Sequence, residues 1–276
     1  MQKILLTTEA SADAQAEDRE RLPGLTVAIA TFGMRFLQLK PERFPPYPGV
    51  RYQIFVQAMT AEAPHHAGAL RHRTDLVVTF LDGAGAAGNR NAAIAAVADD
   101  ILLFADDDLV FCGETYADLR RRFAGDDRLD FICGRLITAA GLPRKAYRPD
   151  GQRVTRFNCG RVGTPELAIR PARFRAKALQ FDPRFGAGAP LWLGDEYIFL
   201  CDALRLGLRG RHVALDLAVH PEESSGTVYS TESFEVRRQV INRATGIYAL
   251  PLRWAFALKH RRRFPDGRSI LRFLGL

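Results

Sequence analysis

Three adjacent aspartates, Asp106, Asp107 and Asp108, directly follow the apolar run at residues 101–105. Such a run is typical of a buried strand, so the carboxylates are expected at the carboxyl end of that strand, where open α/β sheets bind ligands. Carboxylates this close repel one another unless water, hydrogen bonds or a cation offsets the repulsion. A hard divalent cation with oxygen ligands is one solution. The alternative is an exposed acidic turn, because Asp also favours turns and caps.

A competing motif lies upstream, where residues 83–88 read G-x-G-x-x-G after an apolar strand and before a helical segment. With Asp106 as the ribose-binding acid, this is the pattern of a dinucleotide-binding fold. The fingerprint normally follows the first strand, whereas two earlier strands precede it here. Three adjacent carboxylates would also repel a pyrophosphate. We therefore interpret residues 83–88 as a flexible loop rich in glycine and alanine.

The composition is typical of a globular protein, and the charge favours an anionic partner. The chain has 276 residues, 47% of them hydrophobic, and a formal net charge of +8. This length is enough for one large α/β domain or two small ones, and the charge favours a nucleotide, a nucleic acid or an anionic membrane surface. No secretory signal and no apolar run of about 20 residues is evident, which predicts a soluble or peripheral cytoplasmic protein. Four widely spaced cysteines are expected to be buried, reduced thiols: Cys112, Cys133, Cys159 and Cys201.

Strand and helix patterns alternate along the chain. Strands are predicted at residues 25–32, 52–58, 76–81, 129–138, 166–170 and 213–219, and helices at 91–98, 115–123 and 195–206. This alternation predicts an α/β fold with a largely parallel sheet covered on both faces. Residues 141–163 form a long loop, which in a compact domain is usually functional.

Both ends of the chain differ from the central part. Residues 1–21 are polar and predict a flexible leader. Residues 236–276 predict a basic amphipathic helical extension, in which Trp254 and Phe256 precede a cluster of basic residues. One interpretation is an interfacial helix on anionic lipid. The alternative is a solvated basic helix that packs on the domain through these two aromatic residues.

Two sequence blocks together resemble the bacterial family 2 glycosyltransferases. The first block reads GNRNAAI from Gly88, DDILLF from Asp99 and ADDD from Ala105; the second reads FDPRFGAGA from Phe181 and GDEYIFL from Gly194. Their order and separation make the pair more specific than either block alone, and the resemblance spans residues 25–226. It implies a GT-A fold, a single α/β/α sandwich within residues 22–235. The donor half would occupy about 22–138 and the acceptor half 139–235.

The resemblance also implies roles for residues of the donor half. Thr31 and Gln57, at the ends of two strands, would line the nucleotide pocket, with Arg90 and Asn91 alongside; for Thr31 and Gln57, ordinary polar residues at strand ends are the alternative.

The aspartates would then divide the donor and the metal between them. Asp106 would face the ribose or the metal, Asp107 would belong to the donor-binding residues, and Asp108 would ligate the metal. His220 would complete the metal or diphosphate site, since neutral imidazole can serve either role. A purely structural histidine is the alternative.

The second block supplies the expected catalytic base. Transfer by direct displacement needs a group that takes the proton of the acceptor hydroxyl, and a carboxylate within hydrogen-bond reach is the usual choice. The family commonly has Glu and then Asp after the glycine, whereas this chain has Asp195 and then Glu196. By position the base is Glu196, with Asp195 as the second candidate. Alternatively, both acids only stabilise the first turn of a helix through its dipole.

The sequence therefore predicts an inverting, metal-dependent glycosyltransferase of the hexosyltransferase type. Mn²⁺ or Mg²⁺ held by the aspartates would neutralise the departing nucleotide. The resemblance implies a UDP-sugar as the donor and, as the acceptor, a hydroxyl of a glycan or a lipid-linked glycan in surface polysaccharide biosynthesis. The expected location is the cytoplasm, with peripheral contact at the inner face of the cell membrane and no nucleic acid partner.

Two alternative functions stay open. A nucleotidyltransferase would use a similar metal site but would need a phosphate-binding loop after the first strand, which residues 31–35 supply only in part. A non-catalytic basic protein that binds nucleic acid or membrane would have little use for both acidic sites.

Overall fold

A computed structural model describes residues 22–220 and 230–276, so the predicted leader at residues 1–21 lies outside the described residues. Within these ranges one sheet has the strand order β3-β2-β1-β4-β7-β6-β8-β5. Its strands are β1 (Leu25–Phe32), β2 (Val50–Gln57), β3 (Leu76–Phe80), β4 (Ile101–Asp106), β5 (Val110–Phe111), β6 (Phe131–Ile137), β7 (Leu167–Ile169) and β8 (Gly210–Val219).

The sheet is mostly parallel, as predicted. Strands β3, β2, β1 and β4 run parallel, as do β6 and β8, whereas β7 is antiparallel to both β4 and β6 and joins the two parallel sets. In register, Phe32 pairs with Gln57 and Ala30 pairs with Asp106. The carboxyl ends of β1, β2 and β4 therefore meet at one edge of the sheet, which we call the carboxyl edge.

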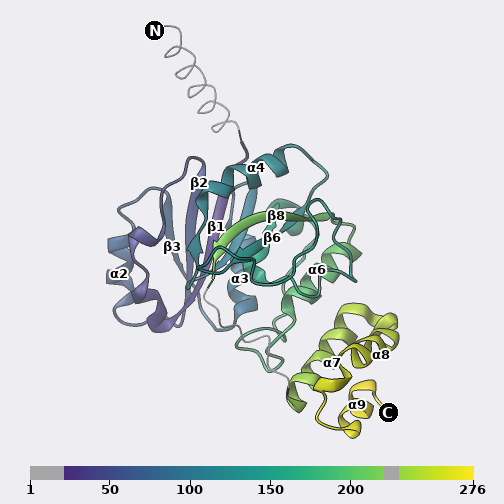
Figure 1. Ribbon diagram of the computed structural model, residues 1–276. Coiled ribbons are helices and arrows are strands. Elements are labelled where there is room, and N and C mark those ends of the chain that lie inside the picture. Colours follow the sequence, from purple (N-terminus) through teal and green to yellow (C-terminus); the bar gives the residue numbers. More distant parts are fainter. Residues whose placement is uncertain (1–21, 221–229) are drawn as a thin grey trace.

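Helices cover both faces of the sheet (Figure 1). Buried side chains of α2 (Ala63–Leu70) and α4 (Tyr116–Ala124) belong to the core on one face, and those of α3 (Ala86–Ala96), α5 (Pro171–Ala176) and α6 (Asp195–Arg205) belong to the core on the other. In the second core, the rings of Phe181 and Phe199 stack with their centroids 3.9 Å apart. Short 3-10 helices are η1 (Gly33–Gln38), η2 (Pro41–Arg43), η3 (Gly113–Thr115), η4 (Thr164–Glu166), η6 (Gly246–Tyr248) and η7 (Arg261–Arg263).

Helix α3 begins at Ala86, five residues before the predicted start. The prediction that residues 83–88 form a loop is therefore wrong for residues 86–88, which belong to the helix. Gly85 precedes the helix with φ = 100°, a conformation that glycine adopts without strain. Two hydrogen bonds fix the first turn: Ala86 N donates to Ala187 O (2.9 Å), and Asn89 Nδ2 donates to Phe55 O (2.8 Å). The first turn of α3 is thereby tied both to strand β2 and to the glycine-rich segment before α6.

Three helices follow the sheet: α7 (Thr231–Thr245), α8 (Ala249–His260) and α9 (Gly267–Leu274). We call them the helical lobe; they share a small core that includes Phe234, Phe264 and Phe273. Figure 1 shows the lobe beside α6. A Cβ atom at Gly194 would lie 2.6 Å from Val240 of α7, so α7 packs tightly against the start of α6. Within residues 22–220 and 230–276, none of the helices combines the length and apolar character required to span a bilayer.

Candidate active site

The carboxyl edge brings together the three predicted metal ligands. Asp106 ends β4, Asp108 follows in the next turn, and His220 follows β8. One ligand atom from each of these residues lies within 4.8 Å of the others. Among the described residues, none forms a hydrogen bond with the buried Oδ1 atom of Asp108. A buried carboxylate oxygen without a partner is costly, so the arrangement is suited to a cation.

The pKa of Asp106 depends on burial and on the charges around it. Burial raises the pKa of Asp106, and the charges of Asp108 and Glu196 raise it further against the attraction of Arg90. A bound cation would favour the ionised carboxylate instead. Two carboxylates and an imidazole are suitable ligands for a divalent cation such as Mn²⁺.

Asp107 points to a different set of partners. Its Oδ2 accepts a hydrogen bond from Thr31 Oγ1 (2.7 Å), and its Oδ1 forms an ion pair with Arg35 of η1. Burial raises the pKa of Asp107, while Thr31 and Arg35 act in the opposite direction. Thr31 and Asp107 were both predicted to contact the donor, and in the structure they form a hydrogen bond with each other. Arg35 also lies 3.7 Å from Asp108, which adds a cation beside the predicted metal ligands.

Arg90 lies between the aspartates and the second acidic pair. Its side chain is 11% exposed, forms an ion pair with Asp195 and lies 4.0 Å from Glu196 Oε1. Its guanidinium also lies 5.5 Å from the ring centre of Phe181. Burial lowers the pKa of Arg90, but the charges of Asp195, Glu196 and Asp106 outweigh burial and raise it. Arg90 therefore stays protonated and interacts with both acidic groups.

Asp195 and Glu196 occupy the first turn of α6 but differ in exposure. The Asp195 side chain is 5% exposed, whereas that of Glu196 is 23% exposed and accepts a hydrogen bond from Thr164 Oγ1 (2.9 Å). Asp195 packs on Gly186, where a Cβ atom would lie 2.6 Å from the carboxylate. Glu196 is thus the acid that solvent or a substrate reaches more easily.

The two acids also differ in protonation. Burial and the Glu196 charge raise the pKa of Asp195 to about 7, against the attraction of Arg90. Burial acts to raise the pKa of Glu196 too, but Arg90 and hydrogen bonds involving Asp195 and Thr164 outweigh it, so this pKa lies below its ordinary value. The two titrate as a pair. In this pair Asp195 is the acid that is more readily protonated, and Glu196 is the acid that is more readily ionised.

The other predicted donor residues lie beside this centre. Gln57 is buried at the end of β2, and its Nε2 lies 3.4 Å from the Cβ position of Gly88. Asn91 forms two hydrogen bonds with the backbone of Phe181: its Nδ2 donates to the carbonyl (2.9 Å), and its Oδ1 accepts from the N–H (2.7 Å). The Asn91 side chain thus fixes the segment that precedes α6.

Sequence reasoning did not assign Arg35 or Thr164 to the site, although it considered residues 31–35 as part of a phosphate-binding loop. The one available signal for Thr164 was its place at the end of the long loop predicted to be functional. Just after that loop, buried Glu166 of η4 contacts two residues of the loop: it forms an ion pair with Lys145 (2.7 Å) and accepts a hydrogen bond from Tyr147 (2.9 Å). These contacts hold Thr164 against Glu196.

Comparisons with known proteins give similar folds. No family model and no curated protein sequence matches the chain. Residues 1–349 of S. aureus TarS in complex with UDP-GlcNAc match with a TM-score of 0.64 at 15% identity, covering 91% of this chain and 80% of that one. The UDP complex of TarS gives a TM-score of 0.61 at 17% identity, covering 89% and 73%. The mannosyltransferase PcManGT from Pyrobaculum calidifontis, in complex with GDP-Man and Mn²⁺, gives 0.53 at 15% identity, covering 94% and 70%. At these identities the likeness shows a shared fold.

The position of Arg90 generates a prediction about stability. Arg90→Met leaves buried Asp195 and partly exposed Glu196 without their cation, and we expect the free energy of unfolding at pH 7 to fall by about 3–5 kcal/mol. Without Arg90 the folded-state pKa values of both acids rise, so their contribution to stability is largest when they are protonated and is lost as pH rises. Urea denaturation should therefore show a smaller deficit at pH 5 than at pH 7.

The double variant Arg90→Met/Asp195→Asn should recover part of the loss, because only one acid is then unpaired. Arg128→Met, at an exposed arginine, is the control and should change stability by no more than about 0.5 kcal/mol. An Arg90→Met protein as stable as the parent at pH 7 would contradict the assignment.

Proposed function

We propose that the chain is a metal-dependent GT-A glycosyltransferase of family 2, which moves a hexosyl group from a nucleoside diphosphate sugar to an acceptor hydroxyl with inversion. The observation that carries this proposal is the pairing of two acidic groups across Arg90. On one side is a carboxylate and imidazole cluster with an unpartnered buried oxygen on Asp108; on the other is the charged, partly exposed Glu196. The fold shared with structures that contain UDP-GlcNAc, or GDP-Man and Mn²⁺, supports the same proposal.

The donor side would bind a diphosphate only with added positive charge. Asp106, Asp108 and His220 would hold Mn²⁺ or Mg²⁺, which when bound supplies the charge that offsets the negative diphosphate. Arg35 lies close enough to Asp108 to contribute further positive charge. Buried Gln57 would offer an amide to the nucleotide. In this proposal a UDP-sugar is the donor.

On the acceptor side, Glu196 would take the proton of the attacking hydroxyl. It is ionised near neutral pH and is held by Thr164 and Arg90, so its carboxylate is positioned before the acceptor arrives. Asp195 is a positioning residue, because it is buried and bonds to Arg90. A base separated from the diphosphate site suits single displacement, which inverts the anomeric centre. The proposed acceptor is a surface glycan or its lipid-linked precursor, a context that rests on the sequence resemblance.

Substitution of Asp108 tests the metal site. With UDP as the probe, we expect Mn²⁺ and UDP together to raise the melting temperature, since a ligand bound only by the native state stabilises it by about 2.7 kcal/mol at a hundredfold excess over Kd. Asp108→Asn should abolish the Mn²⁺-dependent part of the shift and lower the transfer rate by at least about a hundredfold. Thermal shift assays with and without EDTA, and release of UDP from UDP-sugars, provide the readouts. Asp127→Asn, at an exposed site, is the matched control. Equal UDP binding with EDTA, or by Asp108→Asn, would contradict the proposal.

The pH profile of transfer separates the two candidate bases. With Glu196 as the base, kcat at saturating Mn²⁺ should stay level from pH 8 to about 5, because its pKa lies below the ordinary 4.5. With Asp195 as the base, kcat should fall below about pH 7, where this residue gains its proton.

Matched amide substitutions complete this test. Glu196→Gln should reduce kcat by about 10²–10⁴-fold, whereas Asp195→Asn should retain more activity and an acid limb below about pH 5. Loss of activity in Asp195→Asn together with an active Glu196→Gln would reverse the assignment.

A further inference from the structure

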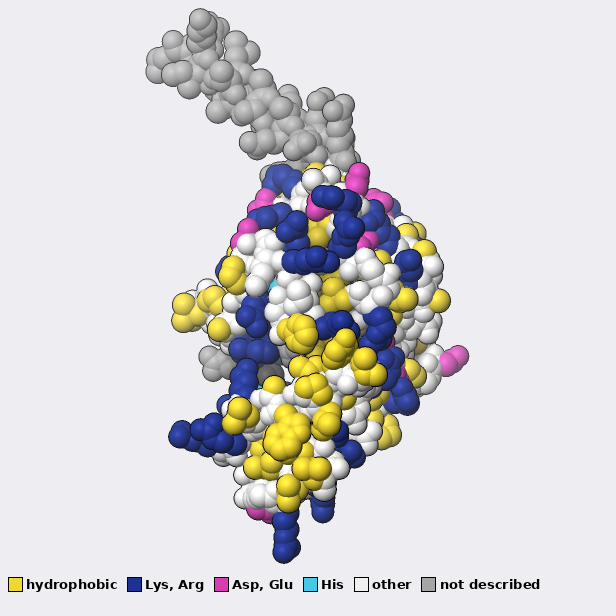
Figure 2. Space-filling model, turned by 90° about the vertical axis from the view of Figure 1, so that its right-hand side faces the viewer, with side chains coloured by type: hydrophobic (Ala, Val, Ile, Leu, Met, Phe, Trp, Pro, Cys, Tyr) yellow, Lys and Arg dark blue, Asp and Glu magenta, His cyan; other side chains and the backbone are white. Residues whose placement is uncertain are grey.

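The helical lobe exposes a stripe of large apolar side chains on α8. Leu250, Trp254 and Leu258 recur every four residues and so share one face of the helix, with Ile247 just before it. Ile247 is 89% exposed, Leu258 67% and Trp254 52%. Figure 2 shows hydrophobic side chains gathered over the lobe with Lys and Arg side chains around them. An exposed apolar patch with a polar rim marks a contact surface.

The segment of the chain that contains this stripe carries positive charge only. Residues 244–265 contain five Lys or Arg residues and no Asp or Glu. Lys259, Arg261 and Arg262 are exposed and directly follow the stripe. A partner for this surface must therefore offer both apolar area and negative charge.

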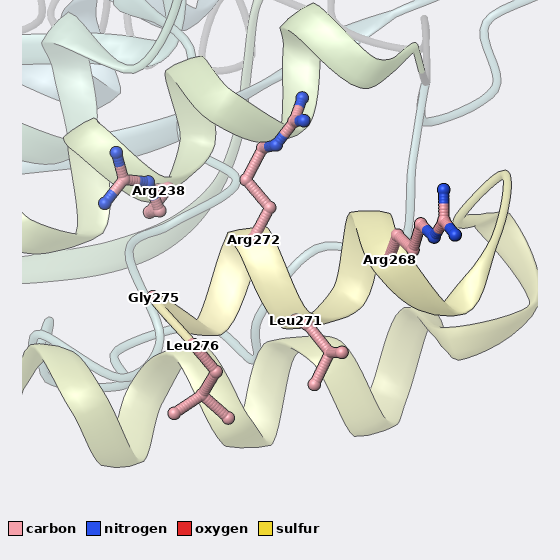
Figure 3. A pocket seen from close by; sticks show the side chains of 6 residues that line it. All are labelled: Arg238, Arg268, Leu271, Arg272, Gly275 and Leu276. Atoms are coloured by element: carbon pink, nitrogen blue, oxygen red, sulfur yellow. The ribbon is translucent and has the colours of Figure 1, made fainter.

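Helix α9, which lies beside α8, also combines apolar and basic side chains. A pocket of about 470 Å³ is lined by Arg238, Arg268, Leu271, Arg272, Gly275 and Leu276. In Figure 3, Leu271 and Leu276 point to one side of α9, and Arg268 and Arg272 point to the other. Arg238 forms an ion pair with Glu235 (Nε to Oε2, 2.9 Å). Arg268 and Arg272 also line the pocket, so its net charge is positive.

We propose that the helical lobe binds the surface of an anionic phospholipid bilayer, with the α8 stripe buried at the boundary between headgroups and acyl chains. Amphipathic helices with Trp and Leu on one face and Lys and Arg nearby lie in this boundary, and anionic headgroups attract the basic residues. A second copy of the chain fits less well, because pairing two stripes would bring the basic residues of both copies together.

The lobe is fixed relative to the proposed catalytic base. Helix α7 packs on α6 through Val240 and Gly194, and α6 carries Glu196 in its first turn. Bilayer binding would therefore hold the acceptor side near the membrane, where a lipid-linked hydroxyl is presented. This consequence for the acceptor rests on the proposed function, whereas bilayer binding itself does not.

Co-sedimentation of the full chain with vesicles tests the proposal. We expect binding to vesicles of equal parts phosphatidylcholine and phosphatidylglycerol, weaker binding at high salt, and little binding to phosphatidylcholine alone. Trp254→Ala/Leu258→Ala should weaken binding by about tenfold or more, and Arg261→Gln/Arg262→Gln should weaken binding to the anionic vesicles. Leu206→Ala, which removes an exposed apolar side chain at the end of α6, is the control and should bind like the parent.

Three results would overturn the proposal: no binding to anionic vesicles, equal binding by the parent and the Trp254→Ala/Leu258→Ala variant, or a dimer without lipid that this variant dissociates. Circular dichroism and the shift with UDP and Mn²⁺, measured on every variant, distinguish loss of the bilayer site from misfolding and from failure of the proposed function.

Discussion

The candidate site depends on one buried cation, the guanidinium of Arg90. The charges of Asp106, Asp195 and Glu196 all raise the pKa of Arg90. Without this cation, carboxylates gathered so closely would repel one another or take up protons. Helix α3 carries Arg90, and the ring of Phe181 lies beside the guanidinium. The guanidinium of Arg90 thus allows the aspartates after β4 and the acids at the start of α6 to lie near the same edge of the sheet, while Glu196 remains charged.

Glycines allow the backbone to approach this centre. Gly85, with its positive φ, starts α3 at the carboxyl edge, and Gly186 leaves the space that the Asp195 carboxylate fills. Gly194, also with a positive φ, precedes α6 and makes room for Val240 of the helical lobe. The glycines of the second sequence block therefore act through packing: they bring α3, α6 and α7 close enough for Arg90 to reach Asp195.

Short-range patterns in the sequence were enough to predict the elements that position the site. Strand β1 matches its predicted range, and α6 starts at the predicted residue, because apolar runs and the residues that bound them determine both. The apolar runs at residues 101–105 and 213–219 place Asp106, Asp108 and His220 after two strands, and the resemblance implies that these residues share a metal site. The start of α3 was missed, because a glycine run resembles a loop unless the partner of its first N–H group, Ala187 O, is known.

The directions of individual side chains were beyond sequence reasoning. Thr31 and Asp107 are 76 positions apart, and Asn91 and Phe181 are 90 apart, so only the folded chain shows that these residues bond to each other. The same holds for the contact of Thr164 with Glu196, which depends on the ordered loop around Glu166. Residue type and strand position predicted where the polar groups gather. Long-range contacts decide which of them remain available to a ligand.

Anomalous diffraction at the manganese edge, from crystals grown with Mn²⁺ and UDP, tests the central claim most directly. Our account predicts one strong peak at the carboxyl edge, bonded to Asp108 and to Asp106 or His220, with the diphosphate of UDP bound to the same ion. UDP bound at this edge without manganese, or manganese bound elsewhere on the described part of the chain, would contradict it.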